Sequence, residues 1–145
     1  MTITEHLHID CPPAVAFDLM ADVRKLTDWN DAASRADMTT AEPIGEGSAF
    51  TVINRGQEMT STITTFDRPH HLGFSVTGKA MDVVATFRFQ PAATGTELVI
   101  EFEPAPKGVM KLLFPLLRPL IRRDLTKQHT KFKDYCEART QPHDA

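Results

Sequence analysis

Histidines near both ends of the chain are the side chains best suited to chemistry. His6 and His8 are two residues apart, so on a strand they point to the same side and could supply two metal ligands. A structural zinc site needs four ligands, and a catalytic zinc site takes three from the protein. Their side is also opposite to that of Ile3 and Leu7. We therefore expect a solvated strand face here, and no metal site.

His129 is the candidate catalytic residue. It falls between Leu125 and Phe132 in a segment of helical spacing, where its ring could reach an interior cavity and act as an acid, a base or a hydrogen-bond donor. The structural alternative is that it marks the border of the apolar stripe. We find no Ser/His/Asp arrangement, phosphate-binding glycine loop, paired inward carboxylates or clustered cysteines at suitable spacing. No cofactor is expected.

A predicted hairpin carries a second set of polar side chains. Arg55 and Gly56 lie between two alternating runs and predict a two-residue loop. The loop would pair Asn54 with Gln57, Val52 with Met59, Phe50 with Ser61, and Ser48 with Ile63. Because paired residues share a face, Asn54, Gln57 and Ser61 are expected beside these apolar partners on one face. They could provide the polar groups of a cavity or form an ordinary hydrogen-bonded rim.

The elements that must position these residues follow from periodicity. Alternation from Ile3 to Ile9 predicts a half-buried strand. Pro13 suits the first turn of a helix, and a second short helix is predicted from Val23 to Trp29. From Asp37 to Glu103, turn signals separate strand-like runs, a pattern typical of an antiparallel meander.

The C-terminal segment changes to helical spacing, which predicts the longest helix from Gly108 to Ala138. Pro115 and Pro119 each remove an internal hydrogen bond. We therefore expect the first half of this helix to be kinked or broken and its regular part to begin near Leu120.

Size and charge limit the number of domains and the class of partner. A chain of 145 residues with 41% hydrophobic and 24% charged residues suits one globular core. We expect one domain over residues 1–140 and a loose tail at 141–145. The net charge of -3 argues against nucleic acid as a partner. The N-terminus lacks the pattern of a secretion signal, so the cytoplasm is the expected location, and no disulfide scaffold is needed.

The order of elements and several short motifs resemble the START-like (SRPBCC) superfamily, in its polyketide cyclase/dehydrase-like branch. The resemblance covers about residues 2 to 138 and rests on motifs of a structural kind. They are Ile9 with Pro12-Pro13 before Val15 and Phe17, Asp22-Val23 followed by Trp29, Gly45-Glu46-Gly47 before a strand, Phe66-Asp67-Arg68-Pro69 with Leu72, Gly95-Thr96-Glu97-Leu98, and the leucine-rich helix.

The resemblance implies an α+β helix-grip fold, in which a curved antiparallel sheet of seven strands surrounds a long C-terminal helix and two short helices follow the first strand. Members of the family variously bind lipids, polyketides, hormones or quinones, and some are enzymes. The expected cavity lies between sheet and helix. Its candidate residues are Trp29, Phe50, Val52, Asn54, Gln57, Met59, Ser61, Ile63, Phe74, Val83, Phe87, Leu117, Ile121, Leu125 and His129. For Trp29, structural packing near the end of the cavity is the main expectation.

Three functions are compatible with these observations. The first is binding of a hydrophobic small molecule, and the second is a cyclase or dehydratase that uses His129 to move a proton. The third is a membrane-associated lipid or quinone chaperone, because the segment 107–123 is both basic and apolar. The leucines of that segment are also expected to fill the sheet. The chain is expected to be a monomer or a homodimer.

Overall fold

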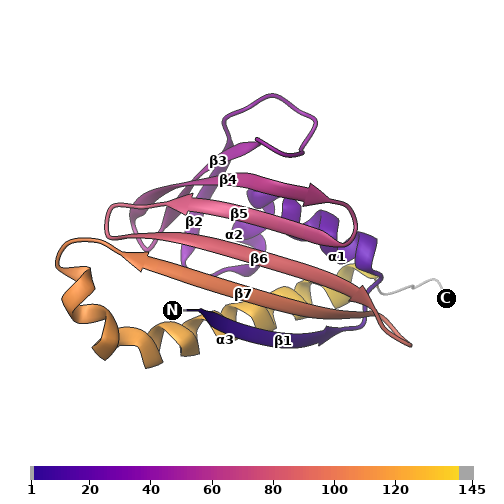
Figure 1. The fold of residues 1–145 in the computed structure, drawn as a ribbon. Coiled ribbons are helices and arrows are strands. Elements are labelled where there is room, and N and C mark those ends of the chain that lie inside the picture. The colour runs from indigo at the N-terminus through magenta and orange to yellow at the C-terminus, as the bar shows by residue number, and fades with distance from the viewer. Residues whose placement is uncertain (1, 141–145) are drawn as a thin grey trace.

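One antiparallel sheet organises residues 2–140, the part of the chain that the computed structural model describes (Figure 1). Its seven strands follow the order β1-β7-β6-β5-β4-β3-β2. The strands are β1 (Ile3–Ile9), β2 (Ala33–Met38), β3 (Ala49–Asn54), β4 (Gln57–Asp67), β5 (His71–Thr77), β6 (Met81–Pro91) and β7 (Thr96–Pro106). The predicted tail at 141–145 lies outside the described residues.

The predicted hairpin between β3 and β4 is confirmed. Arg55 and Gly56 have φ angles of 51° and 79°, the left-handed conformations that a two-residue loop of matching twist requires. The strands pair in the predicted register, Asn54 with Gln57, Val52 with Met59, and Phe50 with Ser61. At the far end, the Ile63 N–H donates to the Ser48 carbonyl at 2.9 Å. The loop therefore determines which side chains share the concave face.

Short helices follow β1, as expected. Helix α1 (Pro13–Ala21) has a proline in its first turn, where a missing N–H costs nothing. The predicted helix from Val23 to Trp29 is a 3₁₀ turn, η1 (Val23–Lys25), followed by α2 (Leu26–Trp29). Strand β2 then begins at Ala33, before the point at which the sequence predicted strands to start. Half of its six residues are polar, and they do not alternate with the apolar ones in the way that reveals a strand.

The long helix α3 (Met110–Thr140) is continuous, so the prediction that its regular part begins near Leu120 is wrong. Pro115 and Pro119 lie inside it, and the ribbon curves through this first half (Figure 1). Both prolines are exposed. The carbonyl groups that lose their helical donors can therefore bind water, and the helix bends without breaking.

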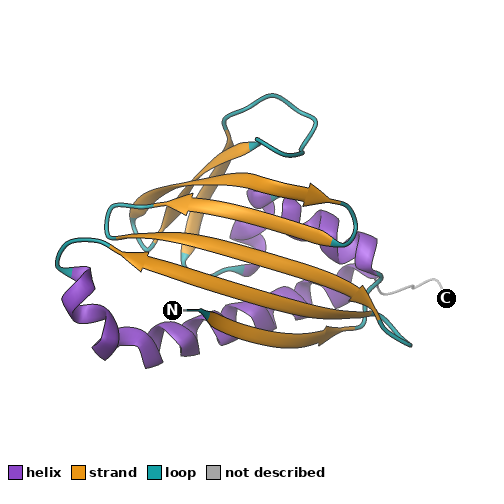
Figure 2. Ribbon diagram, viewed as in Figure 1, coloured by secondary structure: helices purple, strands orange, loops and turns teal. Residues whose placement is uncertain are grey.

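The helices cover one face of the sheet (Figure 2), and aromatic side chains pack within and between the two layers. The Phe17 ring meets those of Phe66 and Phe89 edge to face, with centroids 5.1 Å and 5.4 Å apart. Within the helical layer, Trp29 of α2 meets Phe132 of α3 with ring centroids 5.1 Å apart. Such pairs add to the burial of apolar area. The α+β helix-grip fold predicted from the sequence is confirmed.

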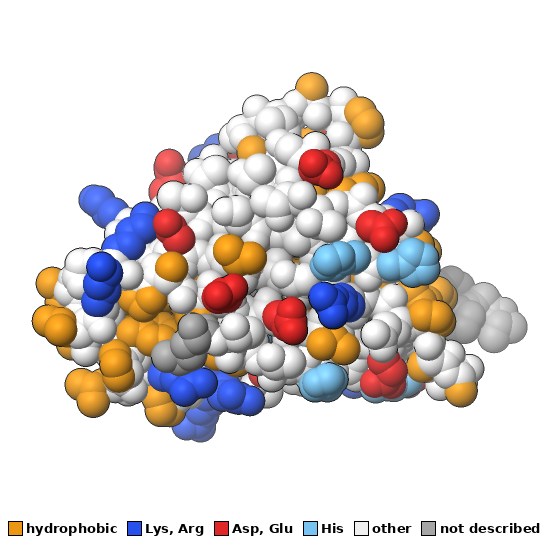
Figure 3. All heavy atoms as spheres, in the orientation of Figure 1, with side chains coloured by type: hydrophobic (Ala, Val, Ile, Leu, Met, Phe, Trp, Pro, Cys, Tyr) orange, Lys and Arg blue, Asp and Glu red, His pale blue; other side chains and the backbone are white. Residues whose placement is uncertain are grey.

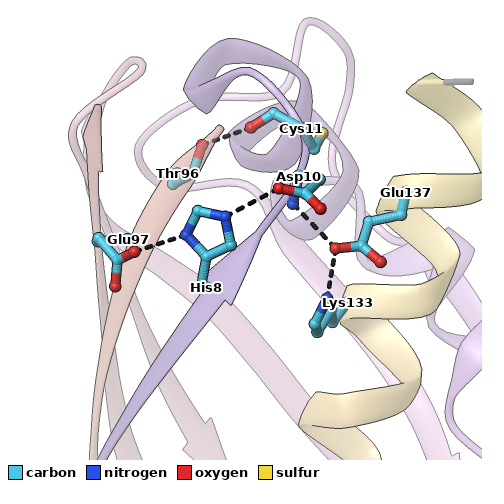
Figure 4. A network of polar contacts seen from close by, with 7 residues as sticks. All are labelled: His8, Asp10, Cys11, Thr96, Glu97, Lys133 and Glu137. Carbon is cyan, nitrogen blue, oxygen red and sulfur yellow. Dashed lines mark hydrogen bonds and ion pairs between the residues drawn. The ribbon is translucent and has the colours of Figure 1, made fainter. Parts of the chain in front are cut away.

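The junction between β1 and α1 depends on a close approach to the turn before β7. Gly95 has a φ angle of 76°, and a Cβ added to it would lie 2.2 Å from the carbonyl oxygen of Ile9. Only glycine avoids that clash. Next to it, the hydroxyl of the fully buried Thr96 donates to the Cys11 carbonyl at 2.6 Å (Figure 4). The Gly95-Thr96 motif therefore fixes where β1 ends.

Helix α3 is attached to the same junction. The backbone N–H of Asp10 donates to the Glu137 carboxylate at 2.9 Å, and Lys133 pairs with the same carboxylate (Figure 4). Cys11 and Cys136 are both buried here. A hydrogen bond with Cys11, together with burial, raises the pKa of the Cys136 thiol. These contacts hold the second half of α3 against the sheet.

Candidate ligand cavity

A cavity of about 680 Å³ lies between the concave face of the sheet and α3. The wall includes every residue predicted for it except Phe50 and Ile63. The predicted residues in the wall are Trp29, Val52, Asn54, Gln57, Met59, Ser61, Phe74, Val83, Phe87, Leu117, Ile121, Leu125 and His129. The structure thus brings side chains from α2, four strands and α3 together around one space. The space is open, not filled by its own aromatic residues.

Phe50 and Ile63 lie in the core instead of the cavity wall. They are 0% and 1% exposed and belong to the main hydrophobic cluster. Both point to the concave face, as predicted, and their cross-strand partners Ser61 and Phe74 do line the cavity. Phe50 and Ile63 are covered instead by other side chains of the core. Face alone does not distinguish a lining residue from a filling one.

The walls are mainly apolar, and Ser61 is the most enclosed polar residue on the sheet side. It is 7% exposed and contributes to the cavity wall. Within residues 2–140 its hydroxyl makes no hydrogen bond. Because Ser61 faces the open cavity, a bound ligand can form a hydrogen bond with its hydroxyl. Asn54 and Gln57 lie further out, half-buried and exposed.

The exposed members of the wall mark the mouth of the cavity. They come from the hairpin loop, the turn between β5 and β6, and the first half of α3, and they are Arg55, Gln57, Lys79 and Leu120. Arg55 pairs with Asp124 of α3 at 2.8 Å. This ion pair joins the hairpin to the helix beside the mouth. Sequence analysis did not single out either charged residue for the site.

His129 meets a carboxylate that sequence analysis overlooked. Its Nδ1 hydrogen-bonds to Glu5 of β1, and the Thr126 hydroxyl donates to the same carboxylate. The side chains of His129 and Glu5 are only 11% and 13% exposed. Burial acts to raise the pKa of Glu5, but the hydrogen bonds from His129 and Thr126 outweigh it and hold that pKa below its usual range.

The ionised carboxylate determines the tautomer of the histidine. Because Glu5 can only accept, Nδ1 of His129 carries the proton in the bond between them. In the neutral ring Nε2 is then an acceptor, and it makes no hydrogen bond within residues 2–140. His129 also contributes to the cavity wall. The arrangement can therefore take a proton at Nε2 and hold the resulting charge beside Glu5.

Glu5 could have been identified from strand parity. It has the same parity as Ile3, Leu7 and Ile9, which places its carboxylate on the buried face of β1. A charged residue at such a position is rarely enclosed without a partner. That signal predicts an inward acid, although it does not name His129 as the partner.

Trp29 has both of the roles considered for it. Its ring lines the cavity and also packs edge to face on Phe132. The neighbouring Asp28 accepts a hydrogen bond from the Tyr135 hydroxyl at 2.9 Å. Burial and this bond raise the pKa of Tyr135. The contacts hold α2 against the second half of α3 and so fix one end of the cavity.

His8 lies away from the cavity, on the outer face of β1. Its ring bonds to Glu97 at 2.6 Å and to Asp10 at 2.9 Å, and these bonds raise the pKa of His8 (Figure 4). His6 is exposed. No group of three or more potential metal ligands occurs within the described part of the chain.

A family model described as polyketide cyclase/dehydrase and lipid transport matches residues 1–137. The chain belongs to this family. The predicted resemblance to START-like proteins is thereby confirmed. No curated protein sequence matches the chain significantly. No helix within residues 2–140 is long and apolar enough to cross a bilayer.

Solved structures share the fold of this family member at low sequence identity. The protein TTHA0849 from Thermus thermophilus has a TM-score of 0.81 at 15% identity, covering 97% of this chain and 100% of that one. The Zhui aromatase/cyclase from Streptomyces sp. R1128 has a TM-score of 0.82 at 13% identity, covering 100% and 98%. A START superfamily protein from Mycobacterium smegmatis has a TM-score of 0.69 at 11% identity, covering 97% of each chain.

Proposed function

We propose that the protein binds a hydrophobic small molecule, polyketide-, lipid- or quinone-like, in the cavity between the sheet and α3. The observation that carries this proposal is an open apolar cavity of about 680 Å³ with the unpartnered hydroxyl of Ser61 in its wall. Cavities of this size accommodate molecules of drug size, with orientation set by a few polar groups.

Burial supplies most of the affinity. A ligand that removes about 300 Å² of apolar surface from water gains roughly 7 kcal/mol before the cost of association. A hydrogen bond to Ser61 adds about 1 kcal/mol and selects ligands with a carbonyl or hydroxyl group at that depth. All three ligand classes can present such a group to the wall.

The first test identifies and then displaces the ligand. Native mass spectrometry of the purified protein, followed by extraction, identifies any co-purified molecule. Titration with that molecule or an apolar fluorescent probe should show saturable binding. Ala85 lies in the wall and Val84 is the adjacent outward residue, so Ala85→Phe should abolish binding whereas Val84→Phe should not. Equal binding by both variants would contradict the proposal.

A second candidate function is proton transfer to the bound molecule, as in a cyclase or dehydratase. The Glu5–His129 pair favours it, because the carboxylate holds Nδ1 of the ring and leaves Nε2 as the nitrogen that can act as a base. In a cyclisation, Nε2 takes a proton from the carbon beside a carbonyl, and that carbon attacks a second carbonyl of the same molecule. The protonated ring then returns the proton to the alkoxide that forms.

Activity on a polyketide-like substrate tests this second function. His129→Ala should abolish turnover, and Glu5→Gln should lower kcat more than it raises KM, because Glu5 positions the ring without touching the substrate. Saturable binding with no turnover by the wild-type protein, or full activity in His129→Ala, would leave binding as the function.

A further inference from the structure

The first half of α3, together with Val109 just before it, exposes a stripe of large apolar side chains. Val109, Leu112 and Leu116 are 70%, 79% and 76% exposed, and Leu113 and Leu120 are 43% and 60% exposed. The expectation that these leucines fill the sheet is therefore wrong. Figure 1 shows the reason, because this half of the helix projects past the edge of the sheet. The five residues are called the apolar stripe below.

The stripe is continuous along the helix. Leu112, Leu116 and Leu120 are four residues apart, so they lie on one face and extend over about 12 Å of the axis. In Figure 3 apolar side chains gather over this part of α3, with basic side chains beside them. Soluble proteins rarely leave such a contiguous apolar surface in water, and its presence indicates a partner.

The charged residues within the segment 107–123 are all positive. Residues 107–123 contain five of the sixteen Lys and Arg residues of the chain and none of its nineteen Asp and Glu residues. Lys107 is paired with Asp82 at 2.7 Å. The other four, Lys111, Arg118, Arg122 and Arg123, form no ion pair within the described residues. A protein of net charge -3 thus concentrates positive charge around five of the six exposed large hydrophobic residues in its described part.

We propose that the apolar stripe and its basic residues dock the protein on an anionic lipid bilayer. Leucines enter the boundary between headgroups and acyl chains, while the basic side chains meet lipid phosphates. A second copy of the chain is a poorer partner for this face, because it would bring the same uncompensated positive charges together.

The docking surface adjoins the mouth of the cavity. Leu120 belongs both to the stripe and to the cavity wall, and Leu117 and Ile121 face the cavity from the same turns of α3. A docked helix would therefore place the mouth near the acyl chains, so an apolar ligand could pass between bilayer and cavity without crossing water. This transfer step rests on the proposed binding function, whereas the docking itself does not.

Co-sedimentation with vesicles tests the docking. The wild-type protein should sediment with vesicles of phosphatidylcholine and phosphatidylglycerol, much less with phosphatidylcholine alone, and less as salt is raised. Leu112→Glu/Leu116→Glu should reduce binding at least tenfold. Val84→Glu, at a residue 50% exposed on β6, is the matched control and should bind as the wild type does. Circular dichroism confirms folding of each variant.

A charge-reversal pair tests the electrostatic part. Lys111→Glu/Arg123→Glu should lose the preference for anionic vesicles, whereas Lys25→Glu/Arg88→Glu, which makes the same change elsewhere, should keep it. Failure of the wild type to sediment, or equal binding by all variants, overturns the proposal. A dimer that Leu112→Glu/Leu116→Glu dissociates, with no vesicle binding, also overturns it and assigns the stripe to self-association.

The same variants separate docking from ligand binding. Leu112 and Leu116 do not line the cavity, so Leu112→Glu/Leu116→Glu should bind the fluorescent probe in solution with unchanged affinity. In an assay of probe transfer between vesicles, this variant should transfer the probe more slowly than the wild type does. Vesicle binding without any probe binding would reject the proposed function while leaving the docking intact.

Discussion

The two halves of α3 differ in what holds them. From Leu125 onward the helix buries Gln128, His129, Phe132, Tyr135 and Cys136 against the sheet and α2. Between Met110 and Asp124 only Phe114 is buried. A single continuous helix thus serves as a core element at one end and as an exposed surface at the other. Helical periodicity alone shows neither role.

Polar contacts follow the same division. In the second half, His129 bonds to Glu5 of β1, and Lys131 pairs at 2.9 Å with Asp31 in the loop between α2 and β2. The first half meets the rest of the domain through Arg55 and Asp124, beside the cavity mouth. An ion pair between two partly exposed side chains adds little to the stability of the fold. The comparison implies that the second half contributes most of the stability of α3, whereas the first half presents most of its exposed surface.

The largest effect is expected at Phe132, in the second half. It is 0% exposed and packs on Trp29, so Phe132→Ala removes a ring from the core and leaves a cavity. The free energy of unfolding should fall by about 3–5 kcal/mol, measured by urea denaturation. A loss below about 1 kcal/mol would show that the second half is not the stabilising half.

Removal of Glu5 should have an intermediate effect. Glu5→Ala leaves His129 and Thr126 without their shared acceptor and should lower the free energy of unfolding by about 2 kcal/mol. The matched control is Glu101→Ala on β7, whose half-buried carboxylate has no ion pair within residues 2–140. A similar loss in both variants would mean that the bonds of Glu5 add no net stability.

Acid should remove the contribution of Glu5. Its folded pKa is lowered, so the stability it adds is full above its unfolded pKa, about 4.3, and is lost as pH falls through the folded value. The difference in unfolding free energy between wild type and Glu5→Gln should therefore be constant above about pH 5 and shrink below it. If this difference stays the same between about pH 2 and about pH 7, within the experimental error, the assignment is contradicted.

The smallest effect is expected in the first half. Leu116 is 76% exposed, so Leu116→Ala should change the free energy of unfolding by less than about 0.5 kcal/mol, in the same urea experiment. A loss near that of Phe132→Ala would show that the stripe packs within the protein in solution, and would remove the basis for a docking surface.

How far the sequence predicts this molecule depends on which kind of signal each residue carries. The hairpin register follows from a local rule, because a two-residue loop at Arg55-Gly56 leaves one pairing. Phe50 and Ile63 were expected in the cavity wall because they have the correct parity. Their depth is decided by what packs above them from distant segments, which no local pattern contains.

The exposure of the leucines could not be predicted for a related reason. An apolar period shows that one face avoids water but not what covers it. Leu112 and Leu125 look alike in sequence, and only the length of the sheet decides that one of them lies beyond its edge. Glu5 is different, because its inward parity was visible and a search for buried charges would have found it.

The two prolines of α3 have a consequence for how the cavity opens. Without N–H groups at Pro115 and Pro119, the carbonyls of Lys111 and Pro115 have no helical donor, so this stretch opens by breaking fewer hydrogen bonds than the rest of the helix. Amide hydrogens at 112–118 should exchange with solvent well before those at 128–136. The first half of α3 is then a local unfolding unit, and each opening widens the mouth while the domain stays folded.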